Sequence, residues 1–180
     1  MSLSPYTIWA MPGAGPALTA AANASMLSAA AAGQSKPVLQ ANWLQAGTIL
    51  EFDAWGVLTT AATPGSGTWQ LNIGSAIQVS SGALVLAASA TAWPWHMNVK
   101  MQCRSLGQTT AAQLWVQGYL DDPTSLTAWS HLPLPQAAVA LGAGFDSTIA
   151  NYVDALWTQS LGTGSFTCEF ATLIAYNPNF

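Results

Sequence analysis

The side chains that could act as a catalytic base are two histidines, His96 and His131. Histidine is the usual general base near neutral pH. His96, however, falls on the polar phase of an alternating stretch, which is typical of a solvent or interface residue. The chain holds no Gly-x-Ser-x-Gly elbow, no Gly-x-x-x-x-Gly-Lys phosphate loop and no His-Glu-x-x-His pair. We therefore expect no catalytic residues, and the protein is predicted not to be an enzyme.

The candidates for an ion site are the adjacent carboxylates Asp121 and Asp122. Carboxylate oxygens at the end of a strand are ligands that Ca²⁺ accepts, although such a pair is more often a solvated strand terminus. No spacing of cysteine and histidine suits zinc. The sequence Gly162-Thr163-Gly164 precedes an expected strand, so it indicates a hairpin turn rather than a dinucleotide cradle. We expect no cofactor and no metal, with Asp121 and Asp122 as the remaining candidates.

Nine tryptophans give the chain an unusual amount of rigid aromatic surface. Trp69 and Trp95 share the apolar phase of their stretches, which predicts that they lie in the core. Exposed tryptophan on a β-sandwich can stack on sugar rings, but more often tryptophan anchors cores and protein interfaces. The residues expected at an oligomer or capsid interface are Trp9, Leu18, Leu27, Trp55, Trp115, Tyr119 and Trp157.

The composition excludes several classes of protein. Of 180 residues, three are basic and seven acidic, and charged residues make up 6% of the chain, against about 25% in a typical domain. Three basic side chains cannot neutralise a nucleic-acid backbone. High hydrophobicity with low net charge argues against disorder. The longest uninterrupted apolar run, residues 83–88, is far shorter than the about 20 residues of a spanning helix, so we expect no membrane partner.

The N-terminus and the two cysteines bear on the cellular compartment. No basic residue precedes Lys36, and Pro5, Pro12 and Pro16 interrupt any apolar run, so no secretory signal is expected. Cys103 and Cys168 both fall on apolar phases of expected strands, where free cysteine behaves as a small hydrophobe. Buried free thiols are the favoured interpretation, and a disulfide between the two is the alternative.

From about residue 37 the hydrophobic period is two. The clearest stretch is 95–105, where Trp95, Met97, Val99, Met101 and Cys103 alternate with polar residues. About eight such runs are bounded by turn residues, which predicts an all-β, jelly-roll-like antiparallel β-sandwich. Residues 37–180 are expected to form this single domain. Residues 1–36, rich in alanine, glycine and proline, are expected to be an extended N-terminal arm with one or two short strands, a helix over 18–32 being the alternative.

Several expected strands are apolar on both faces. Trp55 opposes the Phe52 face of its run, and Trp115 and Tyr119 oppose Leu114. A solitary sandwich wets its outer faces, so this pattern favours a homo-oligomer that covers one of them. The alternative is that a tucked N-terminal arm covers it.

The order of several short motifs resembles that of a family of tailed-phage virion structural proteins, often labelled hypothetical, minor capsid or decoration proteins. The resemblance covers about residues 17–160. The matching positions are Gly47-Thr48, Ala54-Trp55-Gly56, Thr63-Pro64-Gly65, Trp95, Cys103-Arg104-Ser105-Leu106-Gly107, Phe145-Asp146-Ser147-Thr148 and Val153-Asp154. The resemblance implies a virion structural role, a sandwich fold and trimers.

The resulting hypothesis is a capsid decoration, or cement, protein. It would assemble as a homotrimer on the phage head through sheet and arm contacts, with itself and the major capsid protein as partners. It would be made in the host cytoplasm and reside on the capsid surface. The alternative is a tail-fibre, spike or head-fibre module that binds host-surface glycans through tryptophan and aspartate side chains.

Overall fold

The computed structural model describes residues 5–27, 36–125, 128–138 and 141–176. All regular elements within these ranges are β-strands, and none of the described residues forms a helix able to cross a membrane. The strands are β1 (Pro5–Ala10), β2 (Ala24–Ser25), β3 (Val38–Leu39), β4 (Ile49–Thr59), β5 (Ser66–Ile73), β6 (Ala76–Val85), β7 (Trp93–Ser105), β8 (Gln113–Ser125), β9 (Ala128–Leu134), β10 (Asn151–Gln159) and β11 (Ser165–Tyr176).

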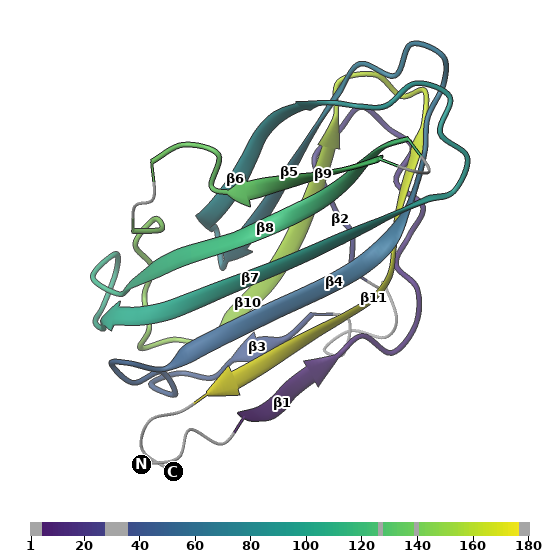
Figure 1. Ribbon diagram of the computed structural model, residues 1–180. Coiled ribbons are helices and arrows are strands. Elements are labelled where there is room, and N and C mark those ends of the chain that lie inside the picture. The colour runs from purple at the N-terminus through teal and green to yellow at the C-terminus, as the bar shows by residue number, and fades with distance from the viewer. Residues whose placement is uncertain (1–4, 28–35, 126–127, 139–140, 177–180) are drawn as a thin grey trace.

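The strands form two facing antiparallel sheets (Figure 1). One has six strands in the order β1-β11-β4-β7-β8-β9, and the other has the order β2-β10-β5-β6, with β3 also paired to β10. The pair β4–β11 in one sheet and the pair β5–β10 in the other are nested along the chain, which is the jelly-roll arrangement. The predicted all-β, jelly-roll-like sandwich is confirmed.

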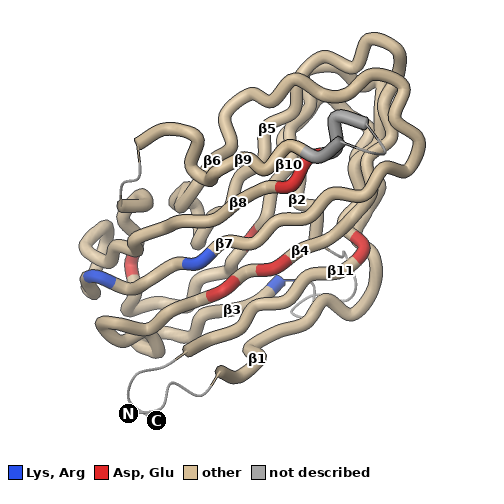
Figure 2. Tube along the Cα trace, in the orientation of Figure 1, with Lys and Arg blue, Asp and Glu red and all other residues tan. Residues whose placement is uncertain are grey.

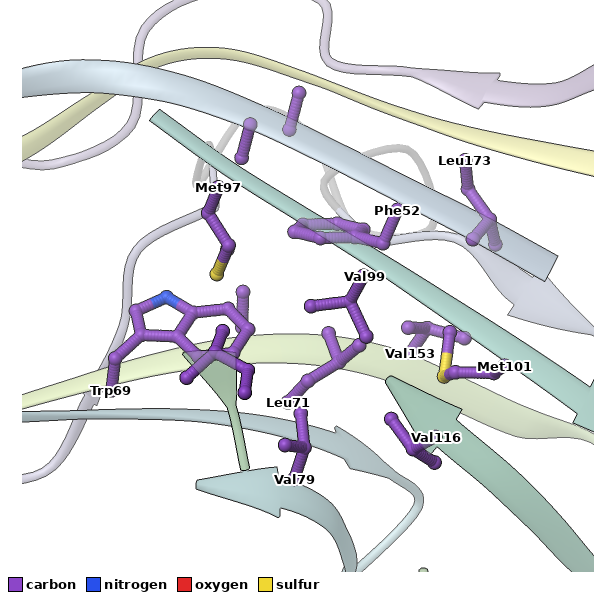
Figure 3. Packing of buried hydrophobic residues seen from close by; sticks show 14 of the residues in the cluster. Phe52, Trp69, Leu71, Val79, Met97, Val99, Met101, Val116, Val153 and Leu173 are labelled. Carbon is purple, nitrogen blue, oxygen red and sulfur yellow. The ribbon is translucent and has the colours of Figure 1, made fainter. Parts of the chain in front are cut away.

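The core lies between the sheets because each long strand alternates as its sequence predicts. On β7, Trp95, Met97, Val99, Met101 and Cys103 are all buried. Met97, Val99 and Met101 of this set meet Trp69 and Leu71 from β5 and Val153 from β10 across the interior (Figure 3). Each large apolar side chain buried in this way contributes about 1.5–3 kcal/mol to folding.

Three aromatic rings join the two sheets at one end of the core. Phe166 of β11 stacks between Trp95 of β7, with centroids 4.5 Å apart, and Trp157 of β10, 4.1 Å away. Trp157 is therefore a core residue of its own chain, which corrects its assignment to an interface. The reason is that odd-numbered residues of β10 face the opposite sheet, as the burial of Val153 and Ala155 also shows.

A β-bulge in β11 changes the phase that the sequence predicts. Cys168 pairs with Gly56, but Phe170 pairs with Trp55, so Glu169 is an extra residue in the ladder. Beyond the bulge Ala171, Leu173 and Ala175 are buried. Strict alternation along the sequence would place Phe166, Cys168, Phe170, Thr172, Ile174 and Tyr176 on one face, but the bulge ends that pattern after Cys168, and Phe170 points outward.

The described part of the N-terminal segment packs on its own sandwich. β1 pairs with β11, Leu18 bridges Phe166, and β2 pairs with β10. One or two short strands are expected in this segment and two are present, and no helix occurs over residues 18–27; residues 28–32 lie outside the described ranges. The segment closes the sheet edges beside β11 and β10 rather than covering an outer face. The domain division at residue 36 stays a prediction.

The two cysteines are buried free thiols, as expected. Burial, together with the nearby charge of Glu169, raises the pKa of the Cys168 thiol to about 12. Burial also raises the pKa of Cys103. Since the thiolate is the reactive form, both thiols are unreactive in the folded protein.

Candidate functional site

The outer face of the six-stranded sheet carries a row of five side chains that are direct cross-strand neighbours. Phe170 of β11 pairs with Trp55 of β4, which pairs with His96 of β7, then Asp121 of β8 and His131 of β9. Five different strands therefore bring these residues side by side. We call this set, Phe170–Trp55–His96–Asp121–His131, the cross-strand row.

The row begins with stacked aromatic rings. Trp55 lies on the imidazole of His96 with ring centroids 3.8 Å apart, and Phe170 lies 6.2 Å from Trp55 with nearly parallel planes. The Trp55 indole N–H donates to Asp53 Oδ2 at 3.2 Å, which fixes the ring against the sheet. Despite these contacts, Trp55 and Phe170 are 37% and 49% exposed. The result is a rigid aromatic surface that is open to solvent.

His96 is held between two carboxylates. Its Nε2 lies 2.7 Å from Asp53 Oδ1 and its Nδ1 lies 3.4 Å from Asp121 Oδ2, while His131 Nδ1 lies 2.6 Å from Asp121 Oδ1. His96 is also buried beneath Trp55, which the sequence-based expectation of a solvent or interface residue did not anticipate. With both ring nitrogens facing carboxylates, His96 acts as a support for Trp55 and has no nitrogen turned to a substrate.

A second group of polar side chains lies beside the row on the same face. Asn98 donates to Glu51 Oε1 at 2.9 Å and to Asp53 Oδ1 at 3.2 Å, and Tyr176 donates to Glu51 Oε2 at 2.7 Å. Burial opposes ionisation of Glu51, but the hydrogen bonds from Asn98 and Tyr176 and the charge of Lys100 outweigh it and hold its pKa below the usual value. The carboxylate is therefore charged and fixed at neutral pH.

A hollow of about 460 Å³ opens next to these groups. Burial, followed by the charges of Asp121, Asp53 and Glu51, raises the pKa of Tyr119, so its hydroxyl stays protonated. The hollow is lined by Glu51, Asn98, Lys100, Gln117, Gly118 and Tyr119. Together with the exposed rings of Trp55 and Phe170, it forms the candidate site.

The remaining interface candidates fall in three kinds of place. Trp115 lies on the site's face, with the guanidinium of Arg104 5.8 Å from its ring centroid. Trp9 and Leu18 are partly buried against the core of their own chain. Leu27 is 2% exposed, so its assignment to an interface is corrected: the side chain anchors the N-terminal segment to its own sandwich.

Asp121 and Asp122 do not form a joint ion site. Strand β8 continues through both positions, so their side chains point to opposite faces of the sheet. Asp121 lies in the cross-strand row, whereas Asp122 is directed toward the interior. In the described part of the chain no three histidine, cysteine or acidic side chains converge in a way that could hold a metal.

Asp122 gives a prediction about stability. Burial raises its pKa to about 6 from 3.8, so folding favours the protonated form, and its contribution to stability falls as pH rises from about 4 through about 6. We expect Asp122→Asn to raise the free energy of unfolding at about pH 8 by about 1–3 kcal/mol. At about pH 4 the variant and the parent should be nearly equal. Urea unfolding at the two pH values measures this, and an equal gain at both would contradict it.

No protein-family model matches the chain, and a search of curated proteins finds no relative. A similar solved structure is the CBM2 module of the evolved Dit protein of Lactobacillus casei BL23 phage J-1. It is 12% identical, the match covers 98% of each chain, and the TM-score is 0.44.

Proposed function

We propose that this chain is a non-catalytic virion structural module that binds host-surface glycans through the outer face of its six-stranded sheet. The virion part is supported by the ordered motifs that the chain shares with tailed-phage structural proteins. The binding part is supported by one observation above all: exposed Trp55 and Phe170 lie on the same sheet face as a hollow lined with polar side chains.

This combination fits the amphipathic character of a sugar. A pyranose ring presents a face of C–H groups, which packs on an aromatic ring, and a rim of hydroxyl groups, which requires hydrogen-bonding partners. Ligand sites generally combine apolar contact area with a few fixed polar groups in this way. Trp55 is prevented from moving by His96 and Asp53, so little conformational entropy is lost when a ligand stacks on it.

Replacing Trp55 with alanine tests the proposal. We expect Trp55→Ala to weaken glycan binding by about tenfold or more, because the main apolar contact is removed. Migration through native gels that contain a panel of soluble polysaccharides measures binding. Tyr152→Ala is the matched control, since Tyr152 is a 53% exposed aromatic residue on the other sheet. Retardation by no member of the panel, or equal retardation of parent and Trp55→Ala, would overturn the proposal.

Capsid decoration as a homotrimer is the second candidate. It is favoured by exposed apolar side chains away from the candidate site, including Ile149 just before β10, Tyr152 at the start of β10 and Val85, 87% exposed, at the end of β6. A contact between copies would bury such residues. Light scattering at micromolar concentration tests it, and a stable monomer would exclude the trimer. Quantitative mass spectrometry of intact particles would separate a head protein, present in hundreds of copies, from a tail module.

A further inference from the structure

We infer that the ligand of this face is an uncharged saccharide rather than an acidic or an amino sugar. The inference rests on the proposed function and names the ligand class of the same site. It follows from two properties of the hollow: which of its hydrogen-bonding atoms have no partner within the described residues, and how its charges are arranged.

The unengaged atoms of the hollow are a mixture of donors and acceptors. Both amide hydrogens of Asn98 are used by Glu51 and Asp53, which leaves its Oδ1 as an acceptor. The amide of exposed Gln117 and the hydroxyl of Tyr119 have no partner in the described structure, and each can both donate and accept. A hydroxyl group also donates and accepts at once, whereas a carboxylate or sulfate only accepts and an ammonium only donates. The set therefore matches sugar hydroxyls.

The charges disfavour ligands of either sign. Glu51, Asp53 and Asp121 place three carboxylates on this face, and Lys100 is the one lysine or arginine among the residues that line the hollow. Figure 2 shows acidic segments along β4 beside a basic segment on β7. An anionic sugar would meet this negative field. A cationic sugar would meet Lys100 first, because the lysine side chain is 60% exposed while that of its partner Glu51 is 14% exposed. The carboxylates are in addition already held by hydrogen bonds within the protein.

A glycan array with matched members provides the experiment. The array carries neutral oligosaccharides, the same oligosaccharides bearing a uronate, sulfate or sialate group, and the same bearing a free amino group. We expect signals on neutral members, at least about tenfold weaker signals on their charged counterparts, and little change between about 50 and about 500 mM NaCl.

A double variant of the hollow adds a second readout. Gln117→Ala with Tyr119→Phe should weaken binding to the neutral members by about tenfold, because two groups that serve the sugar hydroxyls are removed. Both side chains lie on the outer face, so thermal unfolding should be nearly unchanged, which separates lost binding from lost folding.

The outcomes distinguish this inference from the function on which it rests. Stronger signals on acidic or amino members that Trp55→Ala abolishes would overturn the neutral ligand and leave glycan binding intact. Neutral binding that the hollow variant does not affect would likewise overturn the inference. Signals on no member, or signals that Trp55→Ala does not change, would overturn the proposed function itself.

Discussion

Replacing Phe166 with alanine should lower the free energy of unfolding by about 3–5 kcal/mol, the usual cost of removing a buried aromatic side chain. Phe166 is 3% exposed and stacks between Trp95 and Trp157. Its removal would leave two indoles, one from each sheet, facing a cavity. Rigid β-strands on both sides limit how far the structure can relax into that space, so the cost should lie in the upper part of this range.

The matched control for this change is Phe170→Ala on the same strand. Phe170 is 49% exposed on the outer face, so its removal should cost less than about 1 kcal/mol. Urea unfolding followed by tryptophan fluorescence measures both. Equal losses for the two variants would show that the bulge between them does not reverse the phase of β11, and that the assignment of Phe166 to the core is wrong.

Hydrophobic alternation is sufficient to predict most of the fold. On β7 the alternation of Trp95, Met97 and Val99 with polar residues runs without interruption, and burial follows it except at His96, which lies beneath Trp55. The period is informative here because one face of the strand lies on the core and the other does not. The same signal predicts about eight strands, and the eight strands from β4 to β11 define the all-β class.

The errors arise where a local irregularity changes the phase. Glu169 is the extra residue of a bulge. The sequence from Phe166 to Tyr176 does not reveal the bulge, because apolar and small residues occur in both phases of the strand after Glu169. The correction affects the site, since the bulge is what turns Phe170 outward toward Trp55 and places Tyr176 within reach of Glu51. Bulges often redirect side chains in this way near functional sites.

The candidate site could be predicted only in part. Trp55 and Tyr119 are recognisable as outward aromatic residues from the sequence. The contacts of His96 with Trp55, Asp53 and Asp121 depend on the register between β4, β7 and β8, and register between strands is not encoded in any one stretch. The signal that was available is that His96, Asp53 and Asp121 all have the polar phase of their strands, which is enough to place them on one face but not side by side.

Gly56 connects the packing of the core to the geometry of the site. A Cβ atom at this position would lie 2.0 Å from the backbone oxygen of Thr167 and 2.5 Å from the indole of Trp95. The pairing of β4 with β11 holds the Thr167 oxygen in place, and stacking on Phe166 holds the Trp95 indole in place. Only a glycine lets β11 and Trp95 come this close to β4, and Trp55, the centre of the aromatic surface, is the residue immediately before Gly56.

We therefore expect Gly56→Ala to destabilise the fold by about 3 kcal/mol or more, because the added methyl group overlaps backbone that cannot move aside. Gly13→Ala is the matched control: a Cβ at Gly13 meets nothing within 4 Å, and its effect should stay within about 0.5 kcal/mol. In the fraction of Gly56→Ala that remains folded, glycan binding should also fall, since displacing β4 moves Trp55 off His96. A variant as stable as Gly13→Ala would show that the approach of Trp95 and β11 to Gly56 is not required, and full glycan binding in a destabilised Gly56→Ala would show that the aromatic surface does not depend on this packing.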